Sequence, residues 1–277
     1  MTKPFGVISD THVHNWSAFA TTLPNGVNSR LQAILDETTR CAAEVKAAGG
    51  NRMYHGGDLF HVRGSIAPSV LNPTMDCYRE IIKSGVEIVI NAGNHDLEGK
   101  EADRVGSAIT ALEGIGCRVV NGPNYGGFDE MVIIPWIPNL AKLKEAIEYV
   151  APVDRPGCDL LLHAPIDGVI PGLPDHGLAA VYLAGLGYRR VFSGHYHHHK
   201  DLGGNVFSIG SLTAQTWSDV DKKSGFLIVT PAGVEWRASR APSFVEIDDS
   251  TDPSEIPLIV DGNYVRVKIN SNKASDV

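Results

Sequence analysis

The stretch VEIVINAGNHD (Val86–Asp96) joins an apolar run to three consecutive polar side chains, those of Asn94, His95 and Asp96. The run Val86–Ile90 is rich in β-branched residues and predicts a buried strand. An amide, an imidazole and a carboxylate side by side at the end of a strand indicate either a simple turn or a reactive site at a sheet edge. The rest of the chain decides between the two, because a reactive site needs partners for these groups.

The first half of the chain alternates predicted strands and helices. Apolar spacing near 3.6 residues indicates the helices, glycines that follow them act as stop signals, and short apolar runs indicate the strands. The predicted order is strand Phe5–Ser9, helix Ser29–Ala48, a strand ending at Asp58, helix Ala67–Lys83, strand Val86–Ile90 and helix Arg104–Ile115. This alternation is that of an α/β fold.

Strands dominate the second half. They are predicted at Cys117–Val120, Met131–Ile137, Cys158–His163, Arg189–His197 and in later segments up to Ile269, with helices at Leu140–Val150 and Leu178–Leu186. The run NGPNYGG (Asn121–Gly127) lacks the Lys-Ser/Thr of a phosphate-binding loop and predicts a turn. We expect a four-layer αββα sandwich, in which two mixed β-sheets pack face to face and helices cover their outer faces.

The composition is that of an ordinary globular protein, with 277 residues, of which 43% are hydrophobic and 20% charged. No apolar run approaches the roughly 18 residues that a membrane helix needs. The N-terminus lacks the apolar segment of a signal peptide. The four cysteines are widely spaced, so we expect reduced thiols in a cytoplasmic protein that does not contact a membrane.

The formal net charge of −8 bears on the substrate. A protein that grips long DNA by itself carries a basic surface, because the phosphate backbone supplies most of the affinity. Any contact of this chain with nucleic acid would therefore be local, mediated by metal ions or shared with a partner.

Polar residues that could carry chemistry follow the predicted strands. They are Asp10, His12, Asp58, Asn94, His95, Asp96, His163, His195 and His197. In open α/β sheets the ligand crevice lies at the carboxyl ends of the strands, so we expect these residues to meet at one edge. The pairs Asp10/His12 and His195/His197 are spaced i, i+2, and in an extended chain such residues point the same way. Each pair would then face one site or two adjacent sites.

These side chains favour metal binding. Carboxylate, amide and imidazole donors suit manganese, iron or zinc, and no cysteine is present among them to select zinc. Seven ligands can hold two metals if one carboxylate bridges, which leaves His95 spare. Two metals about 3.5–4 Å apart can activate a water and clamp a phosphate. Hydrolysis of a phosphoester needs both the activated water and the bound phosphate, because negative charge builds on the phosphate oxygens as the leaving group departs.

Five blocks in this order resemble the calcineurin-like metallophosphoesterases. They are DTH (Asp10–His12), GGDLFH (Gly56–His61), GNHD (Gly93–Asp96), LLLHAP around His163 and GHYH (Gly194–His197). GGDLFH and the segment Ser208–Val229 resemble the nuclease branch, typified by the SbcD subunit of the SbcCD exonuclease. The protein-phosphatase branch usually has Asp-Arg-Gly after its Gly-Asp, where this chain has Leu59 and Phe60 after Asp58. The resemblance covers most of Pro4–Ile247 and implies a metallophosphoesterase (nuclease) domain at residues 1–247.

The resemblance also implies roles for these residues. Asp10, His12 and His197 would hold one metal, Asn94, His163 and His195 the second, and Asp58 would bridge the two. His95 would lie over the scissile phosphate and stabilise charge or protonate the leaving oxygen. Asp96 would hydrogen-bond the His95 imidazole and fix its orientation, and His61 would contact the phosphate. The cofactors would be two divalent metal ions, manganese first, with iron, zinc or magnesium as alternatives.

The resemblance implies partners as well. DNA would be the substrate, an SbcC-like ATPase of the SMC family would be a partner, and the chain would form a homodimer through the helices near Ala67–Lys83 and Arg104–Ile115. The acidic stretch Glu246–Pro257 predicts a linker, and Asn263–Ile269 resembles the first strand of a DNA-facing cap domain. Residues 248–277 would thus be a linker and the start of a truncated or vestigial cap.

Simpler interpretations remain for single residues. His163 could be a packed core histidine, but the second metal would then lack a third ligand. Asp96 could cap a helix, His61 could lie in a surface loop, and Arg63 could touch phosphate or be solvated. Two other functions also remain. A small-molecule phosphodiesterase or phosphatase is favoured by the acidic charge and opposed by the DLFH block, and a non-catalytic scaffold is opposed by the complete ligand set.

Overall fold

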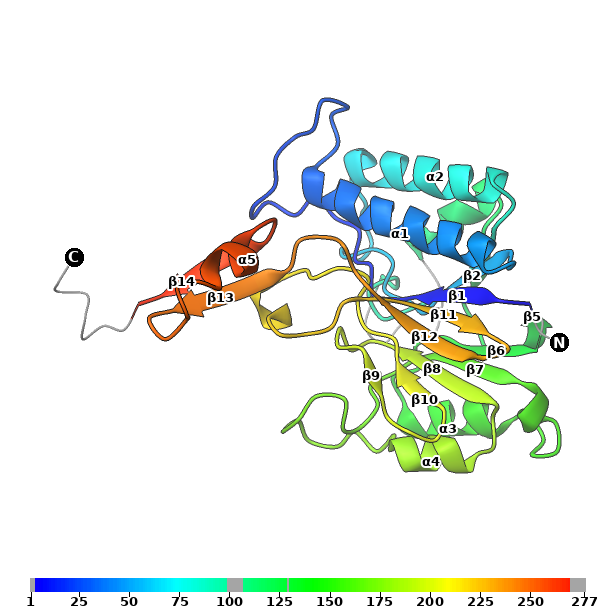
Figure 1. The fold of residues 1–277 in the computed structure, drawn as a ribbon. Coiled ribbons are helices and arrows are strands. Elements are labelled where there is room, and N and C mark those ends of the chain that lie inside the picture. Colours follow the sequence, from blue (N-terminus) through cyan, green and yellow to red (C-terminus); the bar gives the residue numbers. More distant parts are fainter. Residues whose placement is uncertain (1–2, 99–106, 129, 270–277) are drawn as a thin grey trace.

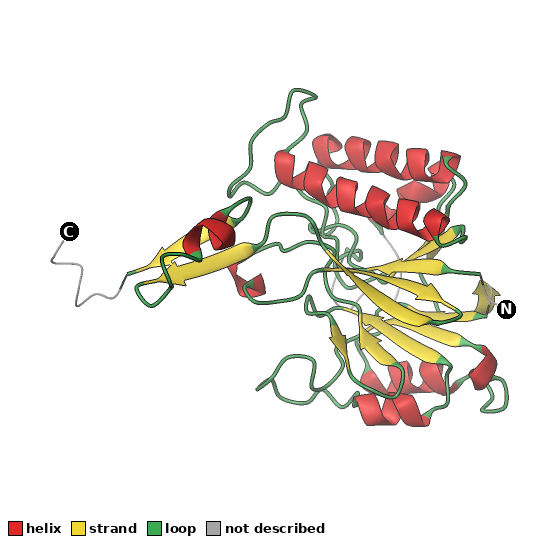
Figure 2. Ribbon diagram, viewed as in Figure 1, coloured by secondary structure: helices red, strands yellow, loops and turns green. Residues whose placement is uncertain are grey.

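Two six-stranded β-sheets face each other, and helices cover the outer face of each sheet (Figures 1 and 2). The structure is a computed structural model that describes residues 3–98, 107–128 and 130–269. This arrangement confirms the predicted four-layer αββα sandwich.

The first sheet has the strand order β12-β11-β1-β2-β3-β4. Its strands are β1 (Phe5–Ile8), β2 (Arg52–His55), β3 (Glu87–Asn91), β4 (Arg118–Val120), β11 (Gly225–Thr230) and β12 (Gly233–Ala238). Strands β1 to β4 are parallel, and β11 and β12 add antiparallel pairings at one side. Its outer face carries α1 (Ser29–Ala47), α2 (Pro68–Lys83) and the 3₁₀ helix η1 (Ala108–Ile115).

The second sheet has the order β5-β6-β7-β8-β10-β9. Its strands are β5 (Asn124–Phe128), β6 (Met131–Ile134), β7 (Asp159–His163), β8 (Arg190–Gly194), β9 (Lys200–Asp201) and β10 (Val206–Ser208). Strands β6, β7, β8 and β10 are parallel, and β5 and β9 are antiparallel edges. The helices α3 (Leu140–Glu148) and α4 (Ala180–Gly185) pack on its outer face, and short 3₁₀ turns η2 (Arg155–Gly157) and η3 (Trp217–Asp219) lie in connections.

The core is divided into three layers by the alternation of side chains along each strand. In β3, Val89 points between the two sheets, whereas Ile88 and Ile90 point toward α1 and α2. In β7, Leu161 points between the sheets, and its neighbours Leu160 and Leu162 point toward α3 and α4. Strands buried on both faces read as continuous apolar runs, which is why the sequence predicts them well.

Three segments differ from the predictions. The predicted turn at Asn121–Gly127 is wrong, because β5 pairs there with β6 across an irregular register. The helix predicted at Arg104–Ile115 is a 3₁₀ helix from Ala108, and Arg104 lies outside the described residues. The expected linker Glu246–Pro257 begins inside a strand, β13 (Phe244–Asp248), and ends inside the helix α5 (Ile256–Val260). The domain boundary expected after Ile247 therefore falls within β13.

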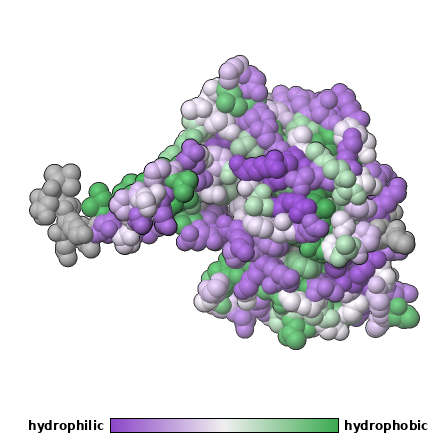
Figure 3. Space-filling view, in the orientation of Figure 1, coloured by the Kyte–Doolittle hydropathy of each residue, from purple (hydrophilic) through white to green (hydrophobic). Residues whose placement is uncertain are grey.

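A small C-terminal unit projects from the body of the molecule (Figure 1). Strand β13 pairs in parallel with β14 (Tyr264–Lys268), and α5 connects the two. The ring of Phe19 stacks on that of Tyr264 with centroids 5.2 Å apart, and the Arg30 guanidinium lies 5.2 Å from the Phe244 ring. These contacts anchor the unit to the body at β13 and β14. Figure 3 shows hydrophobic patches on its surface. Leu258 of α5 and Val267 of β14 are exposed apolar side chains of this unit.

Candidate metal centre

The polar residues that follow the strands meet at one edge of the two sheets. Asp10 and His12 follow β1, Asp58 follows β2, and Asn94 follows β3. His163 is the last residue of β7, and His195 and His197 follow β8. Because the strands are parallel within each sheet, their carboxyl ends lie together, and the structure brings together all seven residues expected as ligands.

Two groups of donors form within this cluster. The ligand atoms of Asp10, His12 and His197 lie within 4.8 Å of one another, as do those of Asp58, His163 and His195. The Asn94 Oδ1 lies 3.0 Å from His163 Nε2 and 3.0 Å from His195 Nδ1, so the amide joins the second group. Each group offers a carboxylate and two imidazoles, a donor set that suits divalent transition metals.

The Asp58 carboxylate lies between the two groups. One oxygen is 3.6 Å from His12 Nε2 and the other is 3.5 Å from His163 Nε2. The His95 backbone N–H donates to Asp58 Oδ1 at 2.7 Å, which fixes the carboxylate from behind. A Cβ atom at Gly93 would overlap the backbone nitrogen and the carboxylate of Asp58, so only glycine allows this approach. The Asp58 carboxylate is thereby placed where it could bind two metal ions at once.

The backbone at this site is bent, not extended. Asp10, His12, Asp58 and His195 have φ angles of 49°, 41°, 55° and 101°, in the left-handed region that favours glycine. The i, i+2 pairs therefore converge through left-handed turns, and the explanation from an extended chain is wrong. Backbone strain of this kind, of order 1–3 kcal/mol per residue, is found where surrounding packing fixes functional side chains.

Asp96 has a different role from the predicted one. Its carboxylate accepts the backbone N–H groups of Asp58, Leu59, Phe60 and Gly93 at 2.9–3.2 Å. Three of these N–H groups belong to the loop after β2 and that of Gly93 to the loop after β3, so the Asp96 carboxylate holds the two loops together. The predicted bond to the His95 imidazole is wrong, because the carboxylate points into the Asp58–Phe60 backbone.

The His95 ring is oriented by a backbone carbonyl. His95 Nδ1 lies 2.8 Å from the carbonyl oxygen of His61, and since a carbonyl only accepts, Nδ1 carries the proton of this bond. The rings of His95 and His12 meet edge to face with centroids 4.7 Å apart, and those of His95 and His61 are near-parallel at 5.7 Å. His95 Nε2 is thus left for a ligand.

His61 lies beside His95 rather than in a solvated surface loop. Its ring packs 4.4 Å from the Trp16 ring and 5.2 Å from the His14 ring, measured between centroids. Burial and the neighbouring histidines lower the pKa of His61 to about 4, so the ring is neutral at pH 7. Arg63 follows in the same loop, and its Nε donates to the Asn94 carbonyl at 2.8 Å, so it supports the loop after β3.

Charges at the site are strongly coupled because it is buried. Burial disfavours a charged His163, but Asp58 outweighs this effect and raises the pKa of His163 to about 9. Burial also acts against a charged Asp58, yet the surrounding histidines, His163 first, hold its pKa well below the usual range. Burial raises the pKa of Asp10 to about 6 and lowers that of His195 to about 3. In the metal-free protein the site thus combines an ionised Asp58 carboxylate with a protonated His163 and a neutral His195.

Three residues around the site were missed by the sequence analysis. Asp219 lies 3.2 Å from His197 Nδ1, Gln215 donates to the Asp10 carbonyl at 2.6 Å, and the Trp136 ring stacks on that of His195 at 5.1 Å. For Asp219 a signal existed, because Thr216 and Asp219 have the spacing of a capping box and form one. Gln215 and Trp136 carry no such signal.

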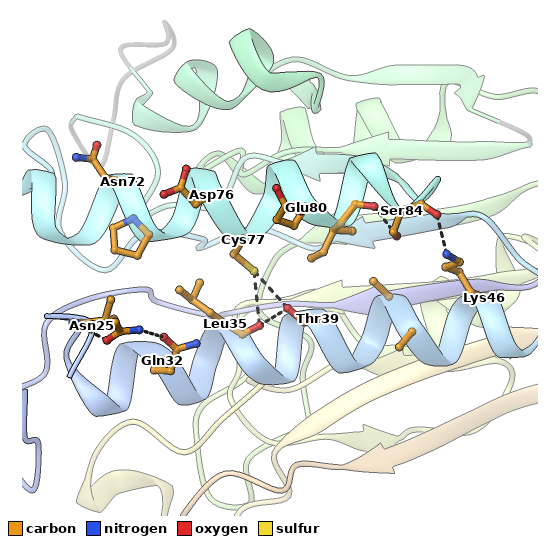
Figure 4. A pocket seen from close by; sticks show the side chains of 15 residues that line it. Asn25, Gln32, Leu35, Thr39, Lys46, Asn72, Asp76, Cys77, Glu80 and Ser84 are labelled. Atoms are coloured by element: carbon orange, nitrogen blue, oxygen red, sulfur yellow. Dashed lines mark hydrogen bonds between the residues drawn. The ribbon is translucent and has the colours of Figure 1, made fainter. Parts of the chain in front are cut away.

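A cavity larger than those beside the candidate metal centre lies elsewhere. It measures about 680 Å³ and lies between α1 and α2, where Leu35, Thr39 and Cys77 line it (Figure 4). None of its lining residues belongs to the candidate metal centre, so cavity size does not locate the chemistry. The four cysteines, all within the described residues, are free thiols. No helix in the described ranges is both long and apolar enough to span a bilayer.

Comparison with protein families identifies one match. The model for the calcineurin-like phosphoesterases matches residues 3–199, which is more than half of the chain. Among curated proteins, none matches this sequence.

Two solved structures illustrate the range of similar folds. One is a Pseudomonas putida nuclease MPE, with 19% identity over 73% of this chain and 65% of the nuclease, and a TM-score of 0.35. The other is a dimetal phosphatase from Danio rerio, with 10% identity over 85% of this chain and 96% of the phosphatase, and a TM-score of 0.45. The chain thus spans less than two thirds of the nuclease, and similarity at this level carries no argument about substrate.

Proposed function

The chain belongs to the calcineurin-like phosphoesterase family, metal-dependent hydrolases of ester bonds that use a dinuclear metal centre, and from this premise we propose that it is a phosphodiesterase and a DNA nuclease of the SbcD type. The observation that carries the proposal is the Asp58 carboxylate lying between two groups of donors, with His61 and His95 beside them. Seven donors in two groups fit a pair of divalent ions.

In this proposal Asp10, His12 and His197 would hold one ion, Asn94, His163 and His195 would hold the other, and Asp58 would be shared between them. Manganese is the first candidate, because the donors are oxygen and imidazole without thiolate, and iron, zinc and magnesium are the alternatives. When bound, the two ions lower the pKa of a water molecule and offset negative charge on the phosphate.

The residues of the chain supply the rest of the reaction. The water gives up one proton to solvent and its oxygen adds to phosphorus, and the bond between phosphorus and the leaving oxygen breaks with its electron pair on that oxygen. His95, held through Nδ1–H by the His61 carbonyl, acts in its doubly protonated form and donates the Nε2 proton to the leaving oxygen, which leaves the neutral Nδ1–H ring. His61 faces a non-bridging phosphate oxygen, and Trp16 keeps water from the outer side of its ring.

Two observations favour different substrates. The His61 ring beside His95 supports DNA cleavage, because the nuclease branch has a histidine at this place in its motif. The net charge of −8 favours the alternative, a small-molecule phosphodiesterase or phosphatase, because the chain lacks an excess of basic residues to attract a long polyanion.

A substrate panel tests the proposal. Plasmid, linear duplex, single-stranded DNA, bis(4-nitrophenyl) phosphate and 4-nitrophenyl phosphate are incubated with manganese, with magnesium or with a chelator. Cleavage of DNA that requires manganese supports the nuclease. Turnover of the small esters while every form of DNA survives would assign the alternative function.

The expected partners stay predictions. They are an SbcC-like ATPase of the SMC family and a second copy of this chain. A cytoplasmic location and a cap-like role of residues 248–277 are predictions of the same kind. Sedimentation velocity of the purified protein distinguishes a monomer from a dimer.

Asp219 gives a prediction about metal affinity. Its carboxylate is buried and accepts from the Gln215 and Thr216 backbone N–H groups and from His197 Nδ1–H, which leaves His197 Nε2 for an ion. We expect Asp219→Asn to weaken binding of one manganese ion by about 10–100-fold, because the imidazole loses the partner that fixes its tautomer. Isothermal titration calorimetry measures the loss.

The matched control is Asp159→Asn. Asp159 is equally buried and pairs with Arg189 and Arg190 at the opposite end of β7. This variant should lower the melting temperature while both ions bind with wild-type affinity. Equal metal affinity in Asp219→Asn and the wild type would contradict the assignment of His197.

Metal affinity should also depend on pH. In the metal-free protein the His163 pKa of about 9 lies above the ordinary value of 6.5, so His163 carries a proton at pH 7 that an ion must displace. The apparent affinity should therefore rise from pH 7 to about 9, by roughly tenfold per pH unit for one released proton, and level off above. Calorimetry in buffers of different ionisation enthalpy counts that proton, and an affinity constant over this range would refute the prediction.

A further inference from the structure

Two small cavities adjoin the candidate metal centre. One lies beside the donor group that contains His195, and the other lies beside His61, near the donor group that contains His12. The first, here named the Trp136 pocket, measures about 200 Å³ and is lined mainly by Trp136, Ile137, Pro138, Leu143, Pro165 and Leu178. The second, the Val62 pocket, measures about 250 Å³ and is lined mainly by Val13, His14, Val62, Ile66, Ala67 and Val70. Neither lining contributes to the metal-ligand set.

The Trp136 pocket is joined to the second donor group. The Trp136 indole stacks on the His195 imidazole, with centroids 5.1 Å apart, and meets the His163 imidazole edge-on at 6.1 Å. Pro165 lies two residues after His163. The Trp136 backbone N–H donates to the Ala92 carbonyl at 2.9 Å, and this bond connects the Trp136 side of the pocket to the loop after β3.

The Val62 pocket is joined to the other side of the centre. Val13 directly follows His12, and Val62 directly follows His61. The His61 backbone N–H donates to the Val13 carbonyl at 3.5 Å, and the His14 ring lies 5.2 Å from that of His61. The His95 ring, which would protonate the leaving oxygen, lies near-parallel to the His61 ring with centroids 5.7 Å apart, and this places the leaving oxygen on the same side of the centre as the Val62 pocket.

Size and lining define what these cavities accept. A cavity of about 150 Å³ holds benzene, so each pocket has room for one ring-bearing group. Aliphatic and aromatic side chains dominate both linings, and neither lining includes a lysine or an arginine that could pair with a second phosphate. Burial of a ring in such a cavity is favoured by the hydrophobic effect.

Resting on the proposed phosphodiesterase function, we propose that the two pockets are subsites for ring-bearing groups on the two ester oxygens of one phosphodiester. The Trp136 pocket takes the group that stays on phosphorus, and the Val62 pocket takes the group that leaves. A phosphomonoester carries one such group and leaves the Trp136 pocket empty. The preferred substrate is therefore a diester with a ring on each side, whether aryl or nucleoside.

Three diesters that share the 4-nitrophenolate leaving group test the Trp136 pocket. They retain methyl, phenyl or thymidine 5′-yl on phosphorus, and each enzymatic rate is divided by the uncatalysed rate of the same compound. We expect kcat/KM for the phenyl and thymidine diesters to exceed that for the methyl diester by roughly tenfold. The order of phenyl and thymidine distinguishes an aryl ligand from a nucleoside ligand.

Substitutions separate the two pockets. Ile137→Ala should lower the ring-to-methyl ratio by roughly threefold or more, whereas Val62→Ala should lower all three rates and leave the ratio unchanged. Val181→Ala, at an apolar side chain 80% exposed on α4, is the control and should change neither. Melting temperatures establish that each variant is folded.

Two results would overturn the proposal. One is a ring-to-methyl ratio near one in the wild type, and the other is an unchanged ratio in Ile137→Ala. Either leaves the phosphodiesterase function intact, because the diesters are still hydrolysed. A protein that hydrolyses no diester or DNA with any metal instead contradicts the proposed function itself.

Discussion

Replacing Asp58 by asparagine is expected to lower kcat for any phosphoester by about 10³-fold or more, because the centre loses the carboxylate that lies between its two donor groups. Asparagine keeps an oxygen that can accept the His95 backbone N–H, as Asp58 Oδ1 does at 2.7 Å, so the loop after β3 should stay in place. The amide bridges two cations poorly since it carries no charge. Calorimetry should show fewer than two bound manganese ions per chain.

A second signature follows from the charge of Asp58. In the metal-free protein this charge raises the pKa of His163, so its removal should lower that pKa from about 9. Nuclear magnetic resonance of the imidazole reports the shift directly. Two ions bound with wild-type affinity in Asp58→Asn would show that the carboxylate does not bridge, and the Asp159→Asn variant again controls for loss of a buried carboxylate.

Replacing His95 by alanine should lower kcat by roughly 10²–10⁴-fold while both metal sites remain intact. His95 belongs to neither of the two donor groups defined above. Its Nδ1–H donates a hydrogen bond to the His61 carbonyl. The loss of kcat should be smaller for an ester of 4-nitrophenol than for DNA. The 4-nitrophenolate ion is a good leaving group that needs little protonation, whereas the alkoxide of a DNA strand needs a proton. Steady-state kinetics on both substrates measures this difference.

His199→Gln is the control for this substitution. His199 is also partly buried and stacked, 5.5 Å from the Trp236 ring, but its Nδ1 bonds the Ser208 carbonyl outside the centre. It should retain wild-type kcat. If His95→Ala lost a metal ion, or if it lost activity equally on both substrates, the imidazole would not be acting on the leaving group.

Much of the fold could be predicted from the sequence. The central strands of the two sheets are buried on both faces, so the apolar runs within Glu87–Asn91 and Asp159–His163 indicate them without knowledge of their neighbours. The helices α1 and α2 could be predicted because their apolar spacing and terminal glycines are local signals. Strand β5 could not, because Asn124–Phe128 is glycine-rich and is held by its pairing with β6.

Some features of the candidate site could likewise be predicted from the sequence, and others could not. The identities of Asp10, His12, Asp58, Asn94, His163, His195 and His197 follow from the sequence, because each comes directly after a predicted strand or ends one. Their convergence follows from the parallel order of strands within a sheet. Whether an individual carboxylate faces an ion or a neighbouring loop does not follow from position, as Asp96 shows.

The layers, the central strands and the chemical types of the candidate donors follow from the sequence, since these depend on residue type and short-range pattern. Three features required the folded chain: the binding of Asp96 to the Asp58–Phe60 backbone, the contact of Asp219 with His197, and the left-handed φ angles of four site residues. Each of these depends on the distance between segments far apart in the chain. The free energy of that packing holds the bent backbone in place, and no local pattern records it.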